Sequence, residues 1–190
     1  MDKELEIIEL IIGDDGEVSA IALVDMPAIE SNWMAFSKQQ SFKIHDEEKR
    51  IVSGYLMKAD LPILRIDNGK EFYVVFRKET IKDIVFKFMK EGLNDSTNLM
   101  HNSNQLADGV YLFESLLIDS ERGIKAPDNF EDAPDGSWWG SMKVDNDEIW
   151  KDIKEGKFRG FSVEGMFKEG ASKTMDEEKI EQLKELLKDL

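Results

Sequence analysis

The chain has 190 residues and a formal net charge of −15, with no cysteine and two histidines, His45 and His101. Its length favours one domain with its own core, and the absence of cysteine excludes disulfides, thiolate nucleophiles and Cys-ligated zinc. Nucleic acid is not an expected partner, because a strongly acidic chain lacks the cations that neutralise phosphates. No apolar run approaches the roughly 18 residues of a spanning helix, so we expect no membrane partner and a cytoplasmic protein.

Strands are predicted for most of the chain. The β-branched runs at 4–12 and 17–24 are joined through a Gly-Asp-Asp-Gly turn, which predicts a hairpin. The mixed polar segment 28–48 is expected to be irregular, with Trp33 and Phe36 as its anchors. Alternation and turn residues predict further strands, and a run of Gly, Pro and acidic residues predicts a long loop: the strands are 50–59, 71–76, 110–119 and 138–144, and the loop is 121–136.

Helical spacing of apolar residues appears in three places. Residues 78–91 form an amphipathic pattern that a glycine ends. A short helix is expected after Asp145 or Asn146, either of which could cap it. We predict one domain over 1–170 and an amphipathic helix over 171–190, which either docks on that domain or binds a partner.

The stretch 158–167 carries the most informative pattern. At a period of two, Phe161 and Val163 share one face of a strand, and Ser162 and Glu164 share the other. A hydroxyl and a carboxylate on one face are an unusual choice for a strand that is simply buried. We therefore interpret Ser162 as a candidate nucleophile.

A serine nucleophile needs a neighbouring base, and histidine is the side chain whose ordinary pKa suits that task. Of the two histidines, His101 is the better candidate, because His45 lies in the segment expected to be irregular. The imidazole also needs an acceptor that orients it. Glu164 and Glu114 are both candidates, and we favour Glu164 because it shares a strand face with Ser162.

These residues also allow other interpretations. The segment Gly160–Gly165 is not a G-x-S-x-G elbow and no helix follows it, which argues against an α/β-hydrolase. Without a catalytic role, Ser162 would be a packing residue and His101 a hydrogen-bonding loop residue. A metal-dependent hydrolase built on the acidic cluster 128–135 is a further alternative, although its spacing matches no known metal-binding loop.

Three segments resemble the phage prohead (procapsid maturation) serine proteases of the PBSX-like type, whose fold is similar to that of herpesvirus assemblin. They are Val18-Ser19-Ala20-Ile21-Ala22-Leu23-Val24-Asp25-Met26-Pro27-Ala28-Ile29-Glu30, Asn98-Leu99-Met100-His101-Asn102 and Gly160-Phe161-Ser162-Val163-Glu164-Gly165. The resemblance implies an α+β fold with a closed antiparallel β-barrel core and a few surrounding helices.

The resemblance also implies a function. The protein would be a serine endopeptidase, without a cofactor, that cleaves phage scaffold and major capsid proteins and itself, inside the assembling procapsid in the host cytoplasm. His101 and Ser162 would be its base and nucleophile, and 171–190 a scaffold-like segment. For these two roles we predict adjacent strands, with Ser162 Oγ within about hydrogen-bond reach of an imidazole nitrogen of His101. In the family the third catalytic residue, an acidic residue or a second histidine, usually follows the serine at some distance. Neither Glu164 nor Glu114 fits that pattern, and a dyad of Ser162 and His101 is the alternative. A homo-oligomer is one alternative for its assembly state, and an inactive head-assembly protein with a protease-like fold is the alternative function.

Overall fold

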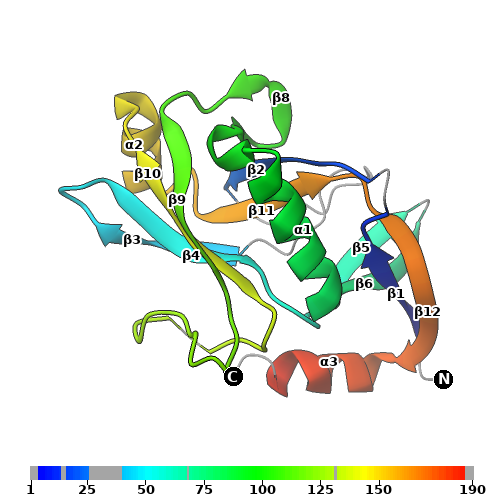
Figure 1. Ribbon diagram of the computed structural model, residues 1–190. Helices are drawn as coiled ribbons and strands as arrows, with labels where there is room; N and C mark the ends of the chain where they lie inside the picture. The colour runs from blue at the N-terminus through cyan, green and yellow to red at the C-terminus, as the bar shows by residue number, and fades with distance from the viewer. Residues whose placement is uncertain (1–3, 14–15, 26–39, 68, 131, 187–190) are drawn as a thin grey trace.

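The computed structural model describes the chain except residues 1–3, 14–15, 26–39, 68, 131 and 187–190 (Figure 1). It is an α+β structure made mostly of strands. The strands are β1 (Glu4–Ile11), β2 (Val18–Val24), β3 (Gln40–Asp46), β4 (Ile51–Met57), β5 (Ile63–Asp67), β6 (Lys70–Phe76), β7 (Thr97–Leu99), β8 (Asn102–Leu106), β9 (Val110–Leu117), β10 (Trp138–Val144), β11 (Gly160–Gly165) and β12 (Lys168–Asp176). The helices are α1 (Lys78–Lys90), the 3-10 turn η1 (Leu93–Asp95), α2 (Asp147–Lys154) and α3 (Glu177–Leu186).

The strands form two sheets of different size. One has the order β12-β1-β6-β5, and the other has the order β8-β7-β2-β11-β3-β4-β10-β9. Most pairs are antiparallel, but β1 runs parallel to β6 and β2 runs parallel to β7. In Figure 1, α1 lies across the middle of the molecule and α3 lies beneath the smaller sheet.

Strand β1 explains why the hairpin predicted for 4–12 and 17–24 is wrong. Leu5 and Ile7 pack with Ile180 of α3 on one face of β1, whereas Ile8 and Leu10 join the main core on the other face. A strand that is apolar on both faces is stabilised only where both faces are covered. Here β1 is paired with β6 and β12 in the smaller sheet, and β2 belongs to the larger one.

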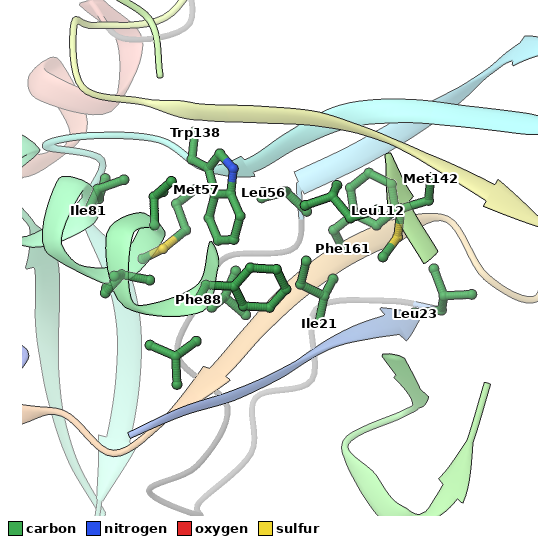
Figure 2. Close-up of a cluster of buried hydrophobic side chains, with 14 of the residues drawn as sticks. Ile21, Leu23, Leu56, Met57, Ile81, Phe88, Leu112, Trp138, Met142 and Phe161 are labelled. Atoms are coloured by element: carbon green, nitrogen blue, oxygen red, sulfur yellow. The ribbon is translucent and has the colours of Figure 1, made fainter. Parts of the chain in front are cut away.

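The main core packs α1 against buried side chains of both sheets. Ile81, Ile84 and Phe88 of α1 are fully buried, and the ring of Phe88 meets that of Trp138 edge-on at 5.3 Å between centroids. Figure 2 shows Phe88 beside Ile21, with Phe161 further along the same cluster. The core therefore fixes one face of β2 and β11, and leaves the opposite face of these strands for other side chains.

Both helices predicted before the C-terminus are confirmed. Helix α1 ends at Lys90, and Gly92 takes the left-handed conformation with φ of 70°. Helix α2 is capped by Asn146, whose side chain accepts hydrogen bonds from the backbone N–H groups of Glu148 and Ile149. Asn146, rather than Asp145, is thus the N-cap. None of the helices in the described residues has the length and apolarity needed to cross a membrane.

Three further expectations differ from the structure. The larger sheet does not close into a barrel in the described part of the chain, because its end strands β8 and β9 are not paired with each other. Residues 40–46 of the segment expected to be irregular form β3, while Trp33 and Phe36 lie outside the described residues. At the C-terminal end, 171–176 belong to β12, so the helix begins at Glu177 rather than at 171.

Candidate active site

Strand β11 alternates between the core and the opposite face, as its sequence predicts. Phe161 and Val163 are buried in the main core, with exposed fractions of 0% and 1%. Ser162 and Glu164 occupy the other face of the strand, because successive side chains of a strand point in opposite directions. They are two positions apart, which is about 7 Å along the strand. We call this surface the site face.

Three strands contribute to the site face. Ser162 of β11 lies opposite Ala22 of β2, and Ala22 in turn lies opposite Asn98 of β7. Residues directly opposite each other across paired strands project to the same face. Ser162, Ala22 and Asn98 therefore form one row across the sheet, and Glu164 lies next to this row, opposite Ala20.

The two alanines of β2 determine what can meet over this face. Ala20 and Ala22 are both buried, and the intervening Ile21 and Leu23 belong to the core on the other side. A methyl group occupies little of the space above the central strand. Side chains from β11 and β7 can consequently meet across β2, although the two strands are not neighbours.

His101 reaches the site from a tight turn. Leu99 of β7 pairs with Asn102 of β8, and the two residues between them, Met100 and His101, have φ of 53° and 58°. Positive φ at both central residues defines a type I′ hairpin turn. The backbone N–H of Met100 donates to the carbonyl of Leu23, so the turn is held against β2.

The side chains of these elements converge on one carboxylate oxygen. The Nδ1 atom of His101 lies 2.8 Å from Oε1 of Glu164, and Nδ2 of Asn98 donates to the same oxygen at 2.9 Å. The side chains of His101 and Glu164 are 15% and 12% exposed. When the Nδ1 proton is directed at the carboxylate, the lone pair of the imidazole is on Nε2. His101 is then oriented as a base with Nε2 available to a substrate or nucleophile.

The structure places Ser162 close in the sheet to this pair, but not as predicted. Ser162 is 2% exposed and lies on β11, which is separated from β7 by β2. The expectation that His101 and Ser162 lie on adjacent strands is therefore wrong. Glu164 bridges β11 and the hairpin of β7, because its side chain extends from β11 to His101.

The other candidates lie elsewhere. Glu114 is exposed on β9, at the far end of the strand order, opposite Ser141. His45 is exposed on β3. In the 128–135 cluster, Asp128 forms an ion pair with Lys125, and no group of three acidic or histidine side chains within the described ranges is arranged to hold a metal ion.

Sequence reasoning missed Asn98 and the two alanines. The alternation Ala20-Ile21-Ala22-Leu23 carries a signal, since small and large side chains take turns on a strand with one crowded and one shared face. The sequence signal for Asn98 is weaker, because it is only a polar residue in a short strand. Neither signal says which strand lies beside which.

A serine, a histidine and a carboxylate on one face of a β-sheet are the groups that serine hydrolases use in acyl transfer. Residues 39–170 match the model of a protein family described as "Putative phage serine protease XkdF", and the chain belongs to this family. The match includes His101, Ser162 and Glu164, and it begins after β2. Neither the curated proteins nor the solved structures gave a match to the chain.

Proposed function

We propose that the protein is a serine endopeptidase in which Ser162 is the nucleophile, His101 the general base and Glu164 the group that orients His101. The observation that carries the proposal is the 2.8 Å contact between His101 Nδ1 and Glu164 Oε1 on the sheet face that also holds Ser162. Membership of the phage serine protease family supports the same chemistry.

The reaction follows from these roles. His101 Nε2 takes the proton of Ser162 Oγ as the oxygen attacks the scissile carbonyl carbon, which gives a tetrahedral oxyanion. The imidazolium is stabilised by Glu164 and returns its proton to the leaving amine, and an acyl-enzyme forms. Water then repeats the sequence, with His101 again the base, and releases the second peptide product and the free serine.

The proposed substrates are the scaffold and major capsid proteins of an assembling phage head, together with the chain itself. The setting would be the procapsid in the host cytoplasm, and a fold kinship with herpesvirus assemblin belongs to the same proposal. The support is membership of the phage family and the eight-stranded sheet that carries Ser162.

The burial of Ser162 favours a second candidate, an assembly protein that keeps this fold without cleaving peptides. Ser162 is 2% exposed, and a nucleophile must be reached by its substrate. A fluorophosphonate, which forms a covalent bond with activated serines, separates the two functions. The protease is expected to carry the adduct on Ser162, located by mass spectrometry of its peptides, whereas an inactive assembly protein remains unmodified.

Cleavage is tested by co-expressing the chain with the scaffold and capsid proteins of the same phage. Intact-mass spectrometry should find shortened products with the native chain and full-length proteins with Ser162→Ala. The same shortened products in both cultures would rule out Ser162 as the nucleophile.

A further inference from the structure

Asn98 makes a contact that the catalytic roles proposed above do not include. Its side chain is 2% exposed, and Nδ2 donates to Oε1 of Glu164, the oxygen that His101 Nδ1 also contacts. The other end of the amide, Oδ1, is buried and has no hydrogen-bond partner within the part of the chain that the structure describes.

This arrangement is unfavourable for a residue that serves the fold alone. A buried carbonyl without a partner has lost its hydrogen bonds to water and gained none in return. An apolar side chain of similar size would avoid that loss at position 98. The Nδ2 donation to Glu164 is therefore the contact that a side-chain amide supplies here and an apolar residue cannot.

The orientation of the amide follows from its partner. If Oδ1 faced Glu164, two acceptors would oppose each other, so Nδ2 is the end that faces an ionised carboxylate. Asn98 and His101 come from one hairpin, β7 and its turn, whereas Glu164 comes from β11. The carboxylate is thus held by two donors of the same hairpin at 2.9 and 2.8 Å.

We propose that Asn98 is a positioning residue that fixes the Glu164 carboxylate against Nδ1 of His101. Glutamate has three rotatable side-chain bonds, and a single contact to His101 leaves the carboxylate free to turn about its own axis. The second donor removes this freedom and keeps the imidazole in the tautomer with its lone pair on Nε2. The catalytic consequence rests on the proposed protease function, but the positioning itself does not.

A spectroscopic test measures the positioning without using activity. In protein labelled with 15N-histidine, the chain gives ring signals from two imidazoles, and His45→Gln assigns them. Native protein is expected to show a slowly exchanging, downfield Nδ1 proton from His101. In Asn98→Ala its exchange should accelerate by about 10-fold or more, because hydrogen bonds to charged groups are among the stronger ones. Unchanged exchange would overturn the proposal.

Two further variants keep this test decisive. Asn98→Asp preserves the shape of the side chain, but an ionised aspartate has no proton to donate to Glu164. This variant should therefore also lose the protected Nδ1 proton of His101, and it provides the test if Asn98→Ala fails to fold. Asn104→Ala removes an exposed asparagine side chain from the same hairpin and should leave the signal unchanged. Loss of the signal in Asn104→Ala as well would mean that the hairpin, not Asn98, holds the contact, which rejects the proposal.

A double-mutant cycle measures the catalytic part on a peptide substrate. In the native background Asn98→Ala should lower kcat about 10- to 100-fold with KM unchanged. In the Glu164→Ala background the same change should lower kcat less than about 3-fold, since Asn98 acts through Glu164. Equal losses in both backgrounds would overturn the proposal. If the native chain cleaves nothing, the protease function has failed, and the exchange of the Nδ1 proton still decides the role of Asn98.

Discussion

His101 Nδ1 lies 2.8 Å from Glu164 Oε1, although the two residues are 63 positions apart and lie on elements that are not paired with each other. The contact crosses β2, where Ala20 and Ala22 leave room for it. The proposed base is therefore oriented by a side chain from the same strand that carries the proposed nucleophile.

Replacing Glu164 with Gln is expected to lower kcat by about 10²- to 10⁴-fold with little change in KM. The amide keeps the size of the side chain but removes the charge that stabilises the imidazolium and favours the productive tautomer. Peptide-cleavage kinetics are the measurement. Glu114→Gln is the matched control and should behave as the native protein, because Glu114 is exposed on β9. A larger loss in Glu114→Gln than in Glu164→Gln would reverse the assignment.

Ser162→Ala is expected to abolish cleavage, with kcat reduced by at least about 10³-fold, because the reaction loses its nucleophile. The matched control is Ser141→Ala. Ser141 is also a buried strand serine, and its hydroxyl shares a hydrogen bond of 2.7 Å with Ser53. This control should lose about 1 kcal/mol of stability and keep its activity. Both quantities follow from denaturant unfolding and kinetics on the same preparations.

Ala22→Leu should disrupt the site by filling the space over β2. The larger side chain would lie between Ser162 and Asn98, the residues on either side of Ala22 in the row. Overpacking is expected to cost about 1–3 kcal/mol of unfolding free energy, and kcat should fall with it. Ala22→Gly keeps the space and should retain cleavage despite a loss of about 1 kcal/mol. Full activity in Ala22→Leu would show that the contact does not need this room.

Met100→Gly should raise the free energy of unfolding by about 1 kcal/mol. Met100 takes φ of 53° in the turn before His101, and a left-handed conformation is unfavourable for a residue with a Cβ. The urea midpoint measures the change. Met166→Gly is the control, since Met166 is also exposed but does not take a positive φ. Met166→Gly should not raise the free energy of unfolding. An equal increase at both positions would show that the left-handed conformation of Met100 is not the cause.

The local patterns were predictable because the responsible residues lie close together in the chain. The period of two along β11 placed Ser162 and Glu164 on one face, and helical spacing predicted α1 and its termination before Gly92. The predicted hairpin between 4–12 and 17–24 was wrong for a different reason. A β-branched run predicts a strand but contains no information about which strand pairs with it.

The sequence by itself determined which groups are available: two histidines, no cysteine, and a serine and a carboxylate two residues apart on one strand. It left Glu164 and Glu114 as alternatives for the partner of His101. Only the tertiary structure decided between them, because β2 lies between β11 and β7 and presents alanines on the shared face. Strand order is a long-range property that depends on how both faces of each sheet are buried, and local periodicity does not determine it.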